Sequence, residues 1–147
     1  ISLGKRKLKN YQNISWKIAT AEKLPFKKNQ FDYYVISFGL RNTKNINKSL
    51  KEAHRVLKKG GRFLCLEFSK IENDNLEILY KKYSKIIPKI GEIVVGEKKP
   101  YEYLLKSIEN FIDQKQLVEK MEKNNFKNCE YRNLSGGIVS LHSGWKI

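Results

Sequence analysis

The chain has 147 residues and a formal net charge of +15, with 30 Lys and Arg against 15 Asp and Glu. This length suits a single domain, residues 1–147, with a buried core. The sequence as given contains neither an apolar run long enough to span a membrane nor a signal-peptide pattern. The two cysteines, Cys65 and Cys129, have only two histidines beside them, which is too few for a zinc site. We expect free thiols in a reducing compartment and no metal.

The excess of positive charge is compatible with a solvated surface, with attraction to anionic lipid or with nucleic-acid binding. Lysines are spread along almost the whole chain and arginines are few, whereas phosphate-binding proteins concentrate arginine for its bidentate fork. The distribution therefore favours a solvated surface, and we expect no nucleic-acid partner.

The first half of the chain alternates between helical and strand patterns. Residues 2–10 have helical character, and residues 14–19 alternate apolar and polar side chains as a strand does. Residues 31–37, rich in aromatic and β-branched residues, predict a buried strand. Residues 45–57 carry apolar side chains at helical spacing and predict an amphipathic helix, stopped by the glycine pair at 60–61.

The middle of the chain continues the alternation. Residues 62–68 predict a strand covered on both faces, so the order of strand, helix, strand and helix implies a parallel sheet with right-handed crossovers. Residues 76–90 predict a basic amphipathic helix that Pro88 ends or kinks. Packing on its own domain is the commoner fate of such a helix, and an anionic membrane surface is the alternative. Residues 88–112 are interpreted as an inserted helical lid.

The C-terminal part predicts a helix followed by a hairpin. Asp113 is a suitable N-cap for a helix over residues 114–123. Residues 129–134 and 138–145 are strand-like and are separated by a Ser-Gly-Gly turn. We therefore expect an antiparallel hairpin that completes the sheet.

Polar groups cluster where the strand over residues 31–37 ends, within the stretch ISFGLRN at 36–42. Ligands of open α/β sheets bind in the crevice outside the carboxyl ends of the strands, so Ser37, Arg41 and Asn42 are candidate site residues. Phosphate-binding loops and the nucleophile-elbow and zinc-protease motifs are absent from the sequence. The glycine pair at 60–61 precedes a strand and is interpreted as a turn.

Five stretches of the chain, in order, resemble the ubiquinone/menaquinone biosynthesis C-methyltransferases. They are AEKLPF at 21–26, ISFGLRN at 36–42, HRVLKKGGR at 54–62, LEFSK at 66–70 and SGGIVSLHSGWK at 135–146. The third is common to many class I methyltransferases, whereas the second, fourth and fifth together are specific to this family.

The resemblance implies an α/β, Rossmann-like class I methyltransferase sheet that ends in an antiparallel hairpin. It also implies methylation, dependent on S-adenosylmethionine, of a ring carbon on a polyprenylated benzoquinol or naphthoquinol. In the family, residues matching Thr20 and Ala21 lie against the adenine, and the residue matching Ser37 lines the cofactor site. The family usually has Asn or Asp at the position of Thr20, which alters that contact, and Pro at the position of Lys59, which only loosens a turn.

The family's glycine-rich loop and its ribose-binding acidic residue have no counterpart after Ile1. The resemblance therefore implies that the first two strands and this loop lie upstream, in a longer protein. We expect residues 1–147 alone to be poorly stable and inactive, because the sheet would have exposed edges and an unfilled core.

The chemistry assigns roles to several side chains. Arg41 can stabilise the phenolate that forms when the quinol loses a proton, and Asn42 can donate to the same oxygen or to a ring substituent. Arg41 is not the base, because a guanidinium stays protonated, so water accepts the proton. Glu67 can orient the substrate or Arg41. Tyr101 and Tyr103 are candidates to line a channel for the polyprenyl quinol, although packing of the lid is the favoured role. His142 is a candidate base or substrate contact, although a structural role is favoured because it lies in the terminal hairpin.

Two rival functions keep the same fold. An RNA methyltransferase would use the positive charge but lacks its usual N/D-P-P-Y/F site, and a non-catalytic scaffold of a quinone-biosynthesis complex fits the absent glycine loop. The resemblance implies a homodimer or such a complex as the assembly, and contact with a membrane surface. The compositional bias favours a bacterial cytoplasmic location at the inner membrane over the mitochondrial matrix side.

Overall fold

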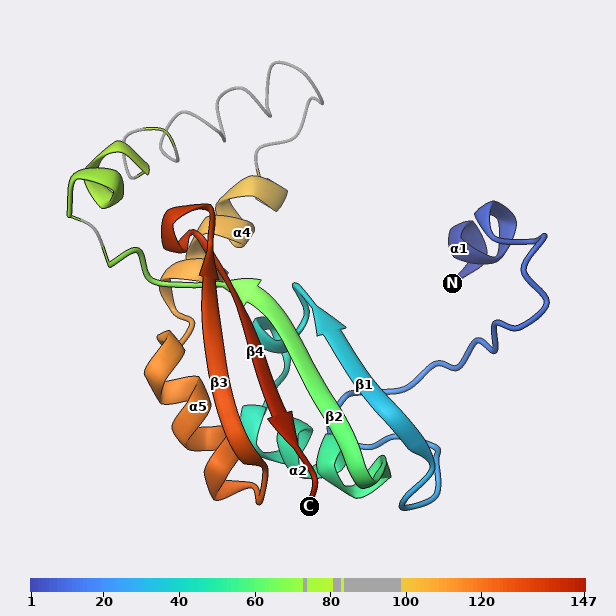
Figure 1. Ribbon diagram of the computed structural model, residues 1–147. Coiled ribbons are helices and arrows are strands. Elements are labelled where there is room, and N and C mark those ends of the chain that lie inside the picture. The colour runs from blue at the N-terminus through green and yellow to red at the C-terminus, as the bar shows by residue number, and fades with distance from the viewer. Residues whose placement is uncertain (73, 81–82, 84–98) are drawn as a thin grey trace.

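The computed structural model describes residues 1–72, 74–80, 83 and 99–147. Within them, four strands form one mixed sheet in the order β1-β2-β4-β3. β1 (Phe31–Ser37) runs parallel to β2 (Leu57–Phe68), whereas β4 (Val139–Trp145) runs antiparallel to both β2 and β3 (Lys127–Leu134) (Figure 1). The fold class is therefore α/β, and the predicted C-terminal hairpin is confirmed.

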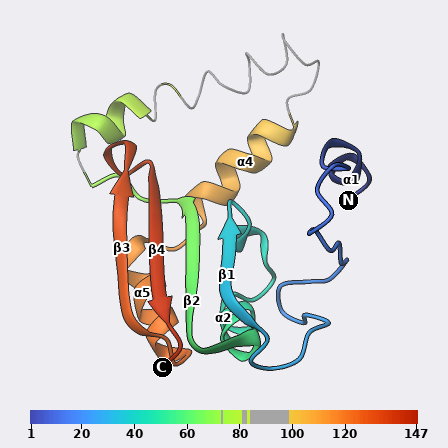
Figure 2. The same ribbon diagram turned by 45° about the vertical axis from the view of Figure 1, so that its right-hand side comes forward.

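Helices cover one face of this sheet. α2 (Ile46–Val56) and α5 (Gln114–Lys123) lie on the same side of it, as both ribbon views show (Figures 1 and 2). α4 (Lys99–Glu109) lies at the end of the sheet to which β1 and β2 point, and α1 (Ser2–Lys7) lies apart from the sheet. In the described part of the chain no helix covers the opposite face.

Side-chain caps fix the starts of the two covering helices. Asn45 accepts a hydrogen bond from the backbone N–H of Lys48 at 3.0 Å, and this cap begins α2. Asp113 and Gln116 form a reciprocal capping box at the start of α5. Both helices begin where the sequence predicts, and α5 has the predicted bounds.

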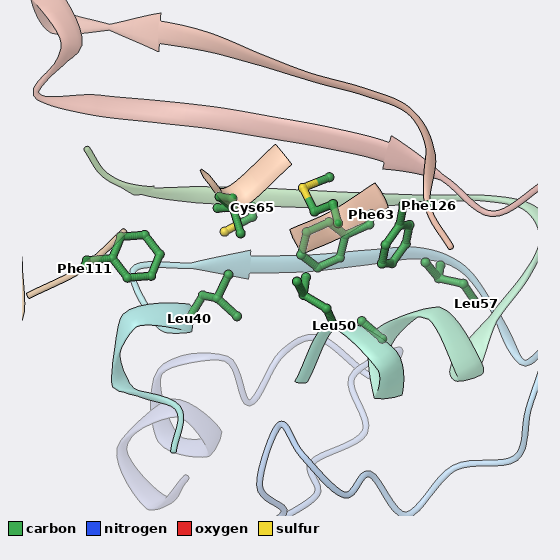
Figure 3. Close-up of a cluster of buried hydrophobic side chains, with 10 residues drawn as sticks. Leu40, Leu50, Leu57, Phe63, Cys65, Phe111 and Phe126 are labelled. Carbon is green, nitrogen blue, oxygen red and sulfur yellow. The ribbon is translucent and has the colours of Figure 1, made fainter. Parts of the chain in front are cut away.

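The core lies between the sheet and these two helices (Figure 3). Phe63 of β2 contacts Phe126 with ring centroids 5.1 Å apart, and Phe126 also meets the ring of His54 edge-on. Burial of these apolar side chains is the main favourable contribution to folding. The other buried members of the cluster are Leu40, Leu50, Ala53, Leu57, Cys65, Phe111, Leu117 and Met121.

The strand predicted over residues 14–19 is wrong, because residues 13–19 form no regular structure. Thr20 makes only an isolated bridge with Lys23. An extended segment needs a neighbouring strand to satisfy its backbone hydrogen bonds, and no strand of the described residues pairs with this segment. Its alternation of apolar and polar residues is therefore not enough to make a strand.

β1 has the predicted bounds but is not buried on both faces. Tyr33 and Val35 are 65% and 66% exposed, while Tyr34 and Ile36 pack against the core. Only β2 pairs with β1 among the described residues, and the helices cover only one side, so alternate residues of β1 face outward.

The glycine pair does not stop the preceding helix. α2 ends at Val56, and β2 begins at the next residue. Between the pairs Phe31–Leu57 and Tyr33–Arg62 the register shifts, so residues 58–61 bulge from the ladder. Gly60 takes φ of +77° in this bulge, a conformation that favours glycine.

The basic helix predicted over residues 76–90 is described only in part. Residues 74–80 are helical, whereas Pro88 and residues 84–98 lie outside the described residues, as does the first half of the predicted lid. α4 falls within the second half of the residues interpreted as a lid. None of the helices in the described part of the chain is long and apolar enough to cross a membrane.

Candidate active site

The turn after β1 places a short 3-10 helix, η1 (Leu40–Asn42), at the carboxyl ends of β1 and β2. Leu40 is buried in the core and anchors η1, so that Arg41 and Asn42 follow on its outer side. Phe38 takes φ of +51°, which is costly for a residue with a bulky side chain. Backbone strain at the end of a parallel strand is typical of a functional turn.

The side chain of Arg41 is held by partners from three elements. Its Nη1 donates to Glu67 Oε1 at 2.7 Å and to the carbonyl oxygen of Phe38 at 2.8 Å, and its Nε donates to Ser107 Oγ at 3.1 Å. The guanidinium carbon also lies 5.2 Å from the ring centroid of Phe68. Three of the five N–H groups of Arg41 are therefore committed to protein atoms.

The remaining two N–H groups of Arg41, both on Nη2, have no acceptor among the described residues. No buried polar side-chain atom of those residues lacks a hydrogen-bond partner. Because Nη2 has no partner among them, it is not one of the buried atoms and is accessible. A positively charged donor in a rigid, largely buried frame is suited to bind an anionic oxygen.

Asn42 is held beside Arg41 through a shared acceptor. The carbonyl oxygen of Phe38 that accepts from Arg41 also faces Asn42 Nδ2 at 3.5 Å, and Asn42 Oδ1 accepts from the hydroxyl of Tyr103 at 3.0 Å. The strained turn therefore holds the guanidinium of Arg41 and the amide of Asn42 next to each other.

A cavity of about 580 Å³ adjoins this turn and includes Asn42 in its lining. Small and uncharged residues from the turn and from the segment before β1 form much of its wall. These are Thr20, Ala21, Ile36, Gly39 and Thr43. Volumes of about 300–1,000 Å³ with apolar walls and a few polar groups are usual for cofactor sites.

Two glutamates hold the irregular segment that carries Thr20 and Ala21. Glu22 Oε1 accepts from the backbone N–H groups of Lys44 and Asn45 at 2.7 and 3.2 Å. Glu52 of α2 accepts from the N–H of Leu24 at 2.7 Å. Hydrogen bonding to backbone N–H groups lowers the pKa of Glu22, since these bonds favour the charged carboxylate. The segment is thereby tied to α2 without being a strand.

The candidate residues do not all come together. Thr20, Ala21 and Asn42 line the same cavity, and Arg41 lies next to Asn42. Ser37 ends β1 with an exposed side chain, after Tyr33 and Val35 on the outward face. Glu67 is fully buried and contacts Arg41, so it orients that side chain and has no surface to offer a substrate.

His142 and Tyr101, the two remaining candidates, do not line the cavity beside η1. His142 is buried, with Nε2 3.1 Å from the carbonyl oxygen of Gln114 and Nδ1 3.4 Å from Ser140 Oγ. Burial lowers the pKa of His142 because it disfavours the charged imidazolium. Tyr101 is half-buried in the first turn of α4.

Sequence reasoning missed the contacts that α4 makes with η1. Tyr103 was expected to pack rather than to bind a polar group, and Ser107 was not considered. Their spacing of four residues places both on one face of a helix, which is the signal that would have paired them.

The sheet, the helices on its face and the cavity at its carboxyl end define a methyltransferase fold of class I. A SAM-dependent methyltransferase of Thermotoga maritima, described as a possible histamine N-methyltransferase, superposes with a TM-score of 0.64 at 22% identity, covering 88% of this chain and 62% of that one. A SAM-dependent methyltransferase of Aquifex aeolicus gives 0.66 at 14% identity, over 99% and 61%. At these identities the likeness concerns the fold alone.

The sequence identifies the family as well as the fold, because residues 1–146 match the model of the ubiE/COQ5 methyltransferase family. The chain belongs to this family. It is 50% identical, over 93% of its length, to the ubiquinone/menaquinone biosynthesis C-methyltransferase UbiE of Rickettsia bellii. It is 46% identical, over its full length, to the mitochondrial 2-methoxy-6-polyprenyl-1,4-benzoquinol methylase of Bos taurus.

The chain spans about half the length of these curated relatives, 56% of the first and 46% of the second. The family and the fold imply S-adenosylmethionine as cofactor. The cavity beside η1 fits such a group, because Ala21, Gly39 and Ile36 offer an apolar wall to an aromatic base. The hydroxyl of Thr20 is a polar group on the same wall that would hold it.

Proposed function

We propose that this protein methylates a ring carbon of a polyprenylated benzoquinol or naphthoquinol with S-adenosylmethionine as the methyl donor. The observation that carries the proposal is that the side chain of Arg41 is held rigidly while two of its N–H donors have no partner among the described residues. Its guanidinium is fixed by Glu67, Phe38 and Ser107, while Nη2 retains two unpaired N–H groups. The next residue in the chain, Asn42, lines a cavity of cofactor size. Membership of the ubiE/COQ5 family and the names of the two relatives support the choice of a quinol.

When bound, S-adenosylmethionine supplies an electrophilic methyl group. The task of the protein is then to make the ring carbon electron-rich and to hold it in line. Nη2 of Arg41 binds the oxygen of the quinol and stabilises the negative charge that develops as its O–H proton leaves. Asn42 donates from Nδ2 to the same oxygen or to a neighbouring ring substituent.

The proton that leaves goes to water rather than to a side chain of this site. Arg41 keeps its protons in proteins, so it acts as a fixed positive charge and not as a base. Both ring nitrogens of His142 face protein atoms in the interior, at Gln114 and Ser140, so this imidazole is engaged elsewhere.

We infer that the protein works at the cytoplasmic face of a bacterial inner membrane, where a polyprenylated substrate resides. Bacterial and mitochondrial proteins both occur among the relatives, and the lysine-rich composition of the chain favours the bacterial setting. A net charge of +15 would assist contact with an anionic lipid surface. Co-sedimentation with vesicles that contain anionic lipid, against neutral vesicles, tests this contact. A homodimer remains the proposed assembly, to be tested by light scattering.

The function is tested by transfer of a labelled methyl group from S-adenosylmethionine to a demethylated quinol, using the full-length protein. Calorimetry with S-adenosylmethionine is run in parallel on the full-length protein and on residues 1–147. Cofactor binding with methyl transfer to the quinol supports the proposal. Binding by neither form favours a non-catalytic scaffold, and methyl transfer to RNA but not to quinols would contradict the quinol assignment.

A further inference from the structure

Two side chains of α4 reach the candidate catalytic residues. Tyr103 donates its hydroxyl proton to Asn42 Oδ1 at 3.0 Å, and Ser107, one helical turn later, accepts from Arg41 Nε at 3.1 Å. Residues four apart lie on one face of a helix, so α4 presents both contacts to η1 together. The far end of α4 is also fixed, because Lys70 Nζ donates to the carbonyl oxygen of Glu109 at 2.7 Å.

The surroundings of Asn42 determine which way its amide points. The carbonyl oxygen of Phe38 can only accept a hydrogen bond, so the amide atom that faces it is the nitrogen, Nδ2. Oδ1 is therefore the atom that meets Tyr103. With Oδ1 occupied by the phenol, the group that Asn42 still offers to a ligand is an N–H donor.

The hydroxyl of Ser107 is oriented in a similar way. Its proton is directed to the carbonyl oxygen of Leu104 at 2.7 Å, one turn earlier in α4. A lone pair of Oγ is then available to Arg41 Nε. Ser107 therefore acts as an acceptor, and it fixes the plane of the guanidinium together with Glu67 and Phe38.

We propose that Tyr103 and Ser107 are positioning residues that aim the free donors of Asn42 and Arg41 at one oxygen of the substrate. This inference rests on the proposed methyl transfer and deepens it, because it specifies an acceptor-only, oxyanion-like oxygen as the group that the site recognises. α4 is then part of the catalytic frame. Neither residue touches the reacting atoms.

The test compares Tyr103→Phe and Ser107→Ala with the unaltered full-length enzyme. We expect kcat to fall about 10-fold to about 100-fold in each variant, since small misplacements of a catalytic group are costly. The Kd for S-adenosylmethionine, measured by calorimetry, should change less than about twofold. Ser107→Thr keeps an acceptor hydroxyl and should restore most of the lost kcat. Ser107→Ala retains a good helix former, so α4 should persist.

Tyr11→Phe is the matched control, because Tyr11 and Tyr103 are both 61% exposed and Tyr11 lies outside this site. Its kcat should equal that of the unaltered enzyme. A kcat for Tyr103→Phe equal to that of Tyr11→Phe would overturn the role of Tyr103. Failure of Ser107→Thr to recover activity beyond Ser107→Ala would overturn the role of Ser107.

A spectroscopic measurement separates this inference from the proposed function. The side-chain amide resonances of Asn42 and the Nε–H resonance of Arg41 should shift in Tyr103→Phe and Ser107→Ala respectively, and neither should shift in Tyr11→Phe. If the resonances shift but the enzyme methylates no quinol, the positioning contacts are supported and the quinol assignment is rejected. Absence of the shifts in an active enzyme would reject the positioning contacts alone.

Discussion

Glu67, at the carboxyl end of β2, and Arg41, in η1, form an ion pair of 2.7 Å whose side chains are 0% and 7% exposed. Glu67 Oε2 also faces the backbone N–H of Arg41 at 3.3 Å, so one carboxylate holds both the side chain and the main chain of this residue. The pair joins the end of β2 to η1, which lie 26 residues apart in the sequence. It fixes the guanidinium by contacts that a flexible surface arginine would lack.

Replacing Glu67 by Gln should lower the free energy of unfolding by about 3 kcal/mol, because it leaves the Arg41 charge buried without its counter-ion. The same change should reduce kcat by letting the guanidinium rotate. Urea denaturation and steady-state kinetics measure the two effects. Asp32→Asn is the control for stability, since the Lys58–Asp32 pair has a similar distance, 2.9 Å, but is exposed. We expect less than about 1 kcal/mol there, and an equal loss in both variants would contradict the assignment.

Arg41→Ala should lower the rate of methyl transfer much more than the affinity for S-adenosylmethionine, because the guanidinium meets the quinol oxygen rather than the cofactor. Arg41→Lys keeps the charge but cannot make the fork of contacts with Glu67, Phe38 and Ser107, so kcat should still fall about 100-fold. Arg62→Lys is the matched control, since Arg62 also stacks on an aromatic ring, that of Trp145 at 4.9 Å. Equal losses of rate and cofactor affinity in Arg41→Ala would reject the assignment.

The elements with strong local signals could be predicted from the sequence. Asp113 and Gln116 form a capping box, and α5 begins where this box requires. β1 follows from a run of aromatic and β-branched residues, and the C-terminal hairpin follows from two strand-like segments separated by a Ser-Gly-Gly turn. Residues 14–19 were predicted wrongly because strand formation depends on a neighbour that no local pattern specifies.

The position of the candidate site could be predicted from the sequence, but the hydrogen-bond partners of its residues could not. The stretch at 36–42 locates Arg41 and Asn42 at a strand end, as the topology rule requires. The partners Tyr103 and Ser107 are more than 60 residues away in sequence, and only the packing of α4 brings them to η1. Contacts of this kind depend on tertiary structure, so residue patterns cannot supply them.

Lys146 near the C-terminus should contribute strongly to stability. Its Nζ donates to the carbonyl oxygens of His54 and Leu57 at 2.8 and 2.7 Å and to Asn29 Oδ1 at 2.8 Å, so it satisfies carbonyl groups where α2 ends. Lys146→Met should lower the free energy of unfolding by about 2 kcal/mol, because these acceptors lose a charged donor. Urea denaturation measures the loss, with the exposed Lys59→Met as control. A loss no larger than that of the control would contradict this role.

His142 should make the stability of the protein depend on pH. Burial lowers the pKa of its imidazole below the ordinary value of 6.5. The unfolded chain then binds a proton more readily than the folded one, so the stabilisation is fully present above pH 6.5 and is lost as the pH falls toward the lowered pKa. Burial also lowers the pKa of His54, which adds to the effect in the same direction.

The free energy of unfolding should therefore fall as the pH drops below the ordinary imidazole pKa of 6.5, and it should fall less in His142→Gln. His54→Gln should flatten the curve independently, and the double variant should flatten it most. Titration of the His142 ring resonances by NMR in the unaltered protein checks the cause without a substitution. A ring pKa at or above 6.5 in the folded state would contradict the burial argument, since desolvation would then not disfavour the imidazolium.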